Sequence, residues 1–226
     1  MIKIQELAPE FFRISLVGAD FFNVYLLEDV LVDSGPRFTS KKLLSMLKGH
    51  PLKAHALTHG HFDHQGGSRL VCASFDIPLW CSEGDREAVE SGNMNSISPL
   101  SSQDLAWLDR WLAGPPQPVS RILHQDDLVG GFRVMEVPGH TPGSLAFWRE
   151  QDRVLLIGDV LFHRNPVTLR SGLSEPFPWV TYDVARNRAS AKTLAALQPS
   201  LVCFGHGKEL RDTRLFGEFI AGLPAA

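Results

Sequence analysis

One run of ten residues contains four side chains that can bind a metal ion. It spans residues 58–67, with the sequence THGHFDHQGG, and directly follows an apolar segment. Its candidate ligands are His59, His61, Asp63 and His64. Imidazole nitrogens and carboxylate oxygens suit zinc and neighbouring transition metals, and a strand that ends in a loop can turn such side chains toward one point. The alternative interpretation is a solvated histidine-rich loop that picks up metal by accident.

Three more ligand-type side chains each follow an apolar segment and a glycine. They are His140, Asp159 and His206. Open sheets tend to place their sites at the C-terminal ends of strands, and an adjacent glycine lets the backbone approach a small object closely. We therefore expect these three side chains to join the first four at one site.

Asp33 also ends a short apolar strand pattern, before Ser34-Gly35-Pro36. It is either a turn or helix-capping residue, which its neighbours favour, or the hydrogen-bond partner of a ligand histidine.

The elements that must position these side chains alternate along the chain. The predicted strands cover residues 2–17, 21–27, 30–33, 54–58, 77–80, 127–137, 145–148, 154–157 and 201–204. The predicted helices cover residues 39–48, 67–75, 83–90, 102–112, 184–197 and a final segment that ends near 223. This order indicates an α/β or mixed architecture with two sheets.

Two segments differ from this alternation. Residues 83–120 are predicted to be a helical insertion beside the site, in which Trp107, Trp111 and Leu112 either pack on the body or line a substrate cleft. Residues 162–182 contain three prolines and are predicted to be an irregular loop over the active face.

Composition excludes some classes of function. Hydrophobic residues make up 44% of the 226 residues, which indicates a folded core. Lys plus Arg number 22 and Asp plus Glu number 25, so the formal charge is −3 and a nucleic-acid partner is not expected. A small anionic substrate held locally is still compatible with this balance.

The cysteines indicate the compartment. Cys72, Cys81 and Cys203 are odd in number and lack metal-ligand spacing, so we expect reduced, buried thiols in a soluble cytoplasmic protein. The first residues lack the apolar core of a signal peptide. No apolar run is long enough to span a bilayer, and no membrane partner is expected.

These motifs resemble those of the metallo-β-lactamase-fold superfamily, especially its glyoxalase II-like hydrolases. The family's HxHxDH motif corresponds to residues 59–64, and its later ligands correspond to His140 in PGHTPGS, Asp159 in GDVLF and His206 in GHG. Asp33 matches the early strand-end aspartate, and the resemblance covers about residues 10–210. It implies a four-layer αββα sandwich with two mixed sheets flanked by helices. A single domain over residues 1–226 would then carry the insertion at about 83–120.

The resemblance also implies a dinuclear metal site. One metal would be held by His59, His61 and His140, the other by Asp63, His64 and His206, and Asp159 would bridge both. Zinc is the first expectation, with iron and manganese as alternatives. A hydroxide shared by two metals would then hydrolyse an activated acyl bond, a thioester or a lactone, in a small-molecule substrate.

Two residues receive catalytic roles in this scheme. Asp63 would orient the nucleophile or accept its proton. Tyr182 would donate a hydrogen bond to the carbonyl oxygen, as a tyrosine does in lactonases of the superfamily, or would be an ordinary packed tyrosine.

Related activities of the superfamily fit less well. Asp159 disfavours antibiotic hydrolysis, and His61 disfavours the flavodiiron proteins. Glyoxalase II itself is disfavoured because the chain ends 20 residues after His206. Its Gly-Arg-Phe-Phe segment after the bridging aspartate is also missing. Arg164 and Arg170 would either serve an anionic substrate or be solvated, and His163 would face the substrate or lie outside the site.

Two hypotheses of other classes stay open. A mononuclear non-haem iron enzyme resembling the persulfide dioxygenases would use His59, His140 and Asp159 as its facial triad. A non-catalytic metal-binding scaffold would show no turnover, but structural zinc sites are usually closed four-ligand cages. The aromatic residues near the insertion also suit a homodimer interface.

Overall fold

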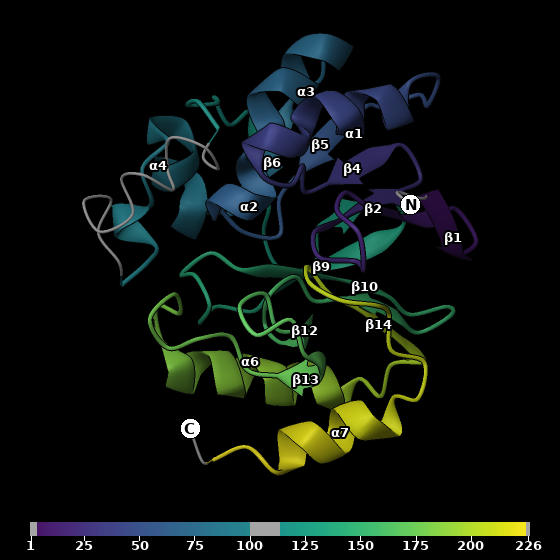
Figure 1. Ribbon diagram of the computed structural model, residues 1–226, viewed down its shortest axis with the longest axis vertical. Helices are drawn as coiled ribbons and strands as arrows, with labels where there is room; N and C mark the ends of the chain where they lie inside the picture. Colours follow the sequence, from purple (N-terminus) through teal and green to yellow (C-terminus); the bar gives the residue numbers. More distant parts are fainter. Residues whose placement is uncertain (1–3, 100–113, 225–226) are drawn as a thin grey trace.

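Two β-sheets face each other in the centre of the protein, and helices cover the outer side of each (Figure 1). The structure is a computed structural model that describes residues 4–99 and 114–224. One outer layer contains α1 (Ser40–Leu47) and α3 (Ser68–Phe75), and the other contains α6 (Val184–Ala196) and α7 (Arg214–Ala221). The predicted four-layer α/β sandwich is confirmed.

The first sheet runs in chain order and changes from antiparallel to parallel. Among the described residues it contains β1 (Ile4–Ala8), β2 (Phe11–Ser15), β3 (Asn23–Leu27), β4 (Val30–Val32), β5 (Ala54–Ala56), β6 (Leu79–Cys81) and β7 (Arg121–Ile122). Pairs up to β3–β4 are antiparallel, and β4–β5, β5–β6 and β6–β7 are parallel. Parallel pairing brings the C-terminal ends of β4 and β5 together, and these ends lead into Asp33 and His59.

The second sheet places two more ligand loops at one edge. Its strands in spatial order are β14 (Leu201–Cys203), β11 (Val154–Leu156), β10 (Leu145–Arg149), β9 (Phe132–Glu136) and β8 (Leu128–Val129). The β11–β14 pair is parallel. The loops that follow β11 and β14, which carry Asp159 and His206, therefore leave the sheet on the same side.

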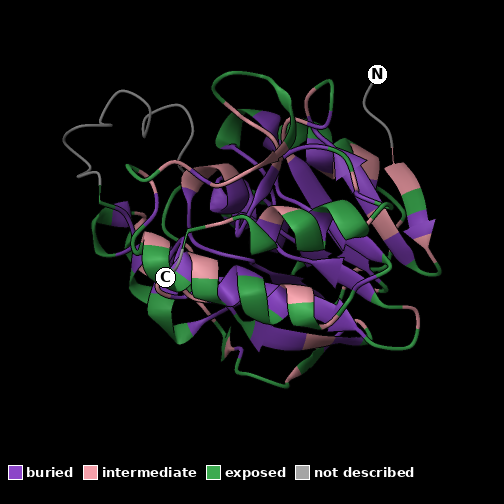
Figure 2. Ribbon diagram, turned by 90° about the horizontal axis from the view of Figure 1, so that it is seen from below, coloured by how far each residue is buried: buried purple, intermediate pink, exposed green. Residues whose placement is uncertain are grey.

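Alternating side chains divide the core between the two faces of each sheet. In β10, Leu145 and Phe147 pack between the sheets, whereas Ala146 and Trp148 pack toward α6 and α7. Figure 2 shows most of the central strands buried and the helices exposed along their outer surfaces. Burial of a large apolar side chain contributes about 1.5–3 kcal/mol, so both faces of this strand stabilise the fold.

Two predicted segments differ from the structure. Residues 2–17 were expected as one arm of a hairpin, but Pro9-Glu10 divides them into β1 and β2, and Glu10 adopts a positive φ of 54°. Residues 162–182 were expected to be irregular, but they contain the antiparallel hairpin of β12 (Phe162–Arg164) and β13 (Ser171–Ser174). The first prediction overlooked the turn at Pro9, and the second took three prolines to mark one continuous loop, although only Pro166 lies between the two strands.

The region of the predicted insertion begins with short helices. These are α4 (Glu83–Ser91) and the 3-10 turn η2 (Met94–Ser96). The short helix α2 (Phe62–Gln65) lies before this region. A second 3-10 turn, η1 (Arg37–Thr39), precedes α1. The predicted helix at 102–112, with Trp107, Trp111 and Leu112, lies outside the described residues. In the described part of the chain, no helix combines the length and apolar character needed to cross a membrane.

Candidate metal centre

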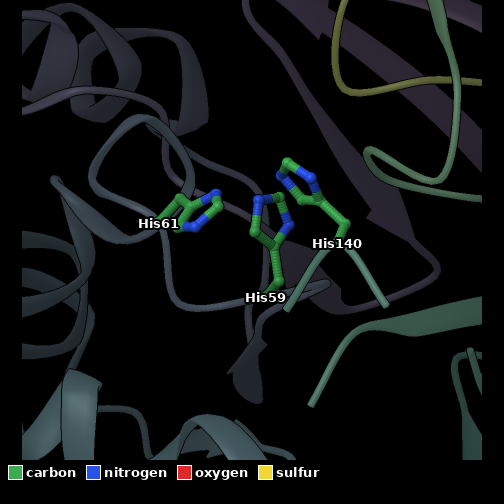
Figure 3. A group of neighbouring side chains, drawn as sticks. All are labelled: His59, His61 and His140. Atoms are coloured by element: carbon green, nitrogen blue, oxygen red, sulfur yellow. The ribbon is translucent and has the colours of Figure 1, made fainter. Parts of the chain in front are cut away.

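All seven predicted ligand side chains converge between the edges of the two sheets, in two groups. The first group is His59, His61 and His140, whose rings are turned toward one another in Figure 3. The second group is Asp63, His64, Asp159 and His206. Within each group the candidate ligand atoms lie within 4.8 Å of one another.

Short loops and a single helical turn aim these side chains. His59 and His61 lie in the loop that follows β5, and His61 is the N-cap of α2, which carries Asp63 and His64. Gly205 passes so close to the second group that a Cβ there would lie 2.1 Å from Asp159 Oδ1 and 2.6 Å from His64 Cε1. A residue with a Cβ would collide with these side chains, so the position before His206 requires a glycine.

Asp159 lies between the two groups. Its Oδ2 atom is 3.2 Å from His206 Nε2 and 3.3 Å from His64 Nε2, both in the second group. The same oxygen is 3.7 Å from His140 Nε2 and 3.9 Å from His59 Nε2, both in the first group. One carboxylate is thus placed to contact cations in both groups.

Asp33 holds a candidate ligand histidine, which supports the second of its two interpretations. His64 Nδ1 donates to Asp33 Oδ2 over 2.9 Å. The Thr58 hydroxyl donates to the same oxygen over 2.8 Å, and Thr58 Oγ1 lies 3.0 Å from His59 Nδ1. With Nδ1 protonated, each imidazole directs its Nε2 lone pair toward the centre. One buried carboxylate therefore orients one histidine of each group.

Asp85 is a positioning residue that the sequence analysis missed. Its Oδ2 accepts the Gly60 N–H over 2.7 Å and the Thr141 hydroxyl over 2.8 Å, while Oδ1 accepts the Gly143 N–H over 2.8 Å. It thereby joins the loop of His59 and His61 to the loop of His140. In the sequence Asp85 is an ordinary acid in the first turn of a helix, and only the tertiary contacts show its role.

The first group consists of neutral imidazoles. Burial, followed by repulsion from neighbouring histidines, lowers the pKa of His59 well below its ordinary value. Burial is also the main cause that lowers the pKa of His61 to about 4 and the pKa of His140 to about 3. At neutral pH these three rings have lone pairs available for a metal.

The second group attracts positive charge. Burial alone would lower the pKa of His64 and of His206. Asp159 and the other nearby carboxylates instead raise the pKa of His64 well above its ordinary value and that of His206 to about 10. Burial would raise the pKa of Asp159, but His206 and His64 hold it well below its ordinary value. An acidic pair that holds protons on two imidazoles is also a site where a cation can replace those protons.

Unpartnered atoms show that these residues fit metal ions. Among the described residues, the Nε2 atoms of His59, His61 and His140 and the Oδ1 atom of Asp159 are buried without a hydrogen-bond partner. Buried polar atoms normally have partners, because an unsatisfied one costs free energy. A mixed set of imidazole and carboxylate donors suits divalent transition metals, so bound cations would satisfy these atoms.

A cavity of about 280 Å³ lies against this centre. His61, Asp63, His140, Asp159 and His206 line it, together with aromatic and aliphatic side chains.

Several other candidate residues lie outside this cavity. The Tyr182 side chain is 55% exposed, and only its backbone N–H approaches the centre, where it donates to His140 O over 3.0 Å. His163 Nδ1 lies 2.8 Å from Lys208 O, and its ring packs against Phe204. Arg164 donates to Ser171 Oγ. The structure does not bring these three side chains into the site.

The three cysteines also lie apart from the site. Cys72, Cys81 and Cys203 are free and buried, as the sequence predicted. Burial raises the pKa of Cys72 to about 12, so this thiol is not a ready nucleophile.

The chain matches known proteins over most of its length. A sequence profile described as "Metallo-beta-lactamase superfamily" matches residues 17–206. The chain is 29% identical over 195 residues to the probable metallo-hydrolase YybB of Bacillus subtilis, which covers 80% of this chain and 76% of that protein. It is 30% identical over 159 residues to the hydroxyacylglutathione hydrolase GloC of Haemophilus influenzae, which covers 69% of each chain.

Two solved structures share the fold. The structure of TTHA1623 in a di-iron-bound form has a TM-score of 0.71 and 29% identity, and covers 92% of this chain and 96% of its own. The BLEG-1 B3 metallo-beta-lactamase has a TM-score of 0.68 and 28% identity, and covers 94% of this chain and 100% of its own.

Proposed function

The chain belongs to the metallo-β-lactamase superfamily, and on that premise we propose that it is a dinuclear metal-dependent hydrolase of an activated acyl bond, a thioester or a lactone. The observation that carries this proposal is the position of Asp159 Oδ2, within 4 Å of imidazole nitrogens of both groups. Two cations that share one carboxylate suit this arrangement.

The second group argues for two cations rather than one. A mononuclear iron enzyme would need only His59, His140 and Asp159. Asp63, His64 and His206 would then form a buried charged cluster with no cation to hold, which is costly. His64 and His206 instead lie around the same Asp159 oxygen, and Asp63 lies next to His206. This supports the dinuclear hydrolase over a single-iron dioxygenase.

In the proposed site, His59, His61 and His140 would hold one cation and Asp63, His64 and His206 the other, with Asp159 shared. When bound, such a cation pair supplies a water of lowered pKa and a positive field for charge that develops on the carbonyl oxygen. The identity of GloC as a hydroxyacylglutathione hydrolase supports an acyl substrate. We propose zinc, and the di-iron form of TTHA1623 makes iron the alternative.

The protein's own groups would handle the proton and the water. Asp63 lies at the floor of the cavity with its Oδ2 3.2 Å from His206 Nε2. Burial would raise its pKa, but His64 and His206 lower it, so Asp63 is ionised and can accept a proton from the attacking water. The oxygen of that water forms a bond to the carbonyl carbon, and the carbon–sulfur or carbon–oxygen bond breaks. The departing thiolate or alkoxide then takes up the proton.

A hydrolysis screen with elemental analysis tests the proposal. Protein purified without added metal is analysed for metal content and assayed against thioesters, lactones, phosphoesters and a chromogenic β-lactam. We expect two metal ions per chain, and turnover of a thioester or lactone that chelation abolishes and added metal restores. One iron per chain with oxygen uptake on a persulfide would support the dioxygenase instead. Metal binding without any turnover would support the scaffold.

A further inference from the structure

The cavity beside the metal centre has aromatic walls. Its aromatic lining residues are Phe21, Phe22, Phe62, Phe162, Phe177 and Trp179. Aliphatic contacts come from Met94, Val167 and Val180. Among the described residues that line it, there is no lysine or arginine, and Arg164 and Arg170 are not in contact with it.

A continuous series of rings leads from the surface to the metal centre. Trp179 is 49% exposed, and its ring stacks on Phe177 with centroids 5.2 Å apart. Phe177 is followed by Phe162 at 6.3 Å, and Phe162 lies edge-on to His206 at 5.1 Å. Aromatic contacts thus connect Trp179 at the surface to Phe162, which lies next to His206. An apolar group laid along this series would extend from the centre toward the cavity mouth.

An anionic group would bind weakly in the same cavity. It would lose its hydration against aromatic walls, and the described residues that line the cavity include no lysine or arginine to replace that water, which is costly for a charge. The volume of about 280 Å³ lies near the lower end of the usual range for ligand pockets, so the group it accepts is small.

Building on the proposed function, we propose that the substrate is an uncharged thioester or lactone whose acyl group is a small aryl or short alkyl group. The acyl group lies along Phe162, Phe177 and Trp179, with its carbonyl at the metal centre. Glutathione thioesters and dicarboxylic acyl groups are excluded from this class, because the described residues that line the cavity include no lysine or arginine to pair with their carboxylates.

Matched thioesters test this specificity. The acetyl, hexanoyl, phenylacetyl and succinyl thioesters of the neutral thiol N-acetylcysteamine differ only in the acyl group, and S-lactoylglutathione supplies the glutathione case. We expect kcat/KM for the phenylacetyl and hexanoyl esters to exceed that for the succinyl ester by at least about tenfold. Equal or faster turnover of the succinyl ester or of S-lactoylglutathione would overturn the inference.

Variants of the cavity mouth test the residues. Trp179→Ala should lower kcat/KM for the phenylacetyl ester about tenfold and change that for the acetyl ester less than about twofold. Leu215→Ala is the matched control, because Leu215 on α7 is also 49% exposed and does not line the cavity. An equal loss with both esters in Trp179→Ala would contradict the assigned role.

A new charge at the mouth gives the complementary test. Val167 lines the cavity and is 62% exposed, so Val167→Lys should be tolerated by the fold. It should raise kcat/KM for the succinyl ester relative to the phenylacetyl ester by about threefold. An unchanged ratio would mean that the mouth does not determine charge selectivity.

A binding measurement distinguishes a failure of this inference from a failure of the proposed function. Ketone analogues, in which a methylene replaces the thioester sulfur, cannot be hydrolysed, and calorimetry measures their affinity for the metal-loaded protein. We expect the phenylacetyl analogue to bind at least about tenfold more tightly than the succinyl analogue. If it does so while no thioester or lactone is turned over, the proposed function fails and the cavity assignment holds. If the succinyl analogue binds as tightly, or neither binds, the inference fails whatever is hydrolysed.

Discussion

At the scale of single residues, the centre depends on side chains that bind no metal themselves. Asp33 orients His64 directly and His59 through the Thr58 hydroxyl. Asp85 ties together the loops on either side of the first histidine group. Removing a hydrogen-bond partner of a metal ligand typically lowers metal affinity by about 10–100-fold. Substitutions of Asp33 and Asp85 therefore test directly how the site is built.

Asp85→Asn should loosen the first group without removing a ligand. The asparagine amide places its NH₂ group against at least one of the three groups that donate hydrogen bonds to Asp85. At least one hydrogen bond to a charged acceptor is therefore lost. We expect metal affinity to fall about tenfold and the free energy of unfolding to fall by about 2 kcal/mol. Equilibrium dialysis at limiting free metal and urea titration measure the two effects. Glu87→Gln, at an exposed acid of the same helix, should change neither.

His55 should make the fold sensitive to acid. It is fully buried between Leu31 O and Ser68 Oγ, and burial lowers its pKa to about 4. The unfolded chain binds a proton near pH 6.5, whereas the folded chain does not, so stability is present above pH 6.5 and is lost as pH falls toward 4. This residue alone should reduce the free energy of unfolding by about 2 kcal/mol between pH 7 and pH 5.

Urea titrations of His55→Gln and the unsubstituted protein at both pH values measure that contribution. The other histidines titrate equally in both proteins, so the difference between the two pH dependences isolates His55. Parallel pH dependences would show that His55 does not titrate in this way.

At the scale of elements, the site depends on parallel strand pairs whose ends coincide. The β4–β5 and β11–β14 pairs are parallel, and each delivers its two following loops to the same edge of a sheet. The loops are short, so backbone and ligand side chains are in contact there. Gly205, in the loop after β14, lies so close to Asp159 and His64 that a Cβ would not fit there.

Gly205→Ala should damage the second group specifically. The new methyl group would displace Asp159 or His64, whose atoms lie 2.1 Å and 2.6 Å from the position of its Cβ. We expect metal content to fall by at least about one ion per chain and activity to fall by at least about a hundredfold. Gly217→Ala in α7 is the control, because nothing lies within 4 Å of its Cβ and alanine favours a helix. Full metal content in Gly205→Ala would contradict the assigned geometry.

The sequence predicted the apolar strands and the ligand residues after them better than it predicted isolated features such as Asp85 and the β12–β13 hairpin. Apolar strand patterns located β5, β9, β11 and β14, and the ligand types after them identified the seven converging side chains. Asp85 could not be found in this way, because its three hydrogen bonds join residues 25 to 58 positions apart. The β12–β13 hairpin was missed because its strands are short and partly exposed, so they lack a periodic apolar pattern.

At the scale of the whole molecule, the candidate metal centre lies where the two halves of the fold, each built on one sheet, meet. His59, His61, Asp63 and His64 follow a strand of the first sheet, and His140, Asp159 and His206 follow strands of the second. Each of the two ligand groups contains residues from both halves. Bound cations would therefore connect the sheets in addition to the apolar core between them.

Metal removal should destabilise the fold. A cation that binds only the folded chain adds about 2.7 kcal/mol at a concentration 100 times its dissociation constant. Exhaustive chelation should therefore lower the thermal unfolding midpoint by several degrees, and added zinc should restore it. Calorimetry of the metal-loaded and chelated protein measures the shift. An identical midpoint in both forms would mean that the cations do not link the two halves.

The carboxylate of Asp33 serves both ligand groups at once, through His64 and through Thr58. When a first ion fixes one of these imidazoles, the same anchor becomes fixed for the other, and less disorder remains to be removed there. Uptake of the two ions should accordingly be cooperative, with a Hill coefficient above one in a metal titration. The protein would then pass from empty to fully loaded with little of the half-loaded form, so scarce metal would yield fewer complete centres rather than many incomplete ones.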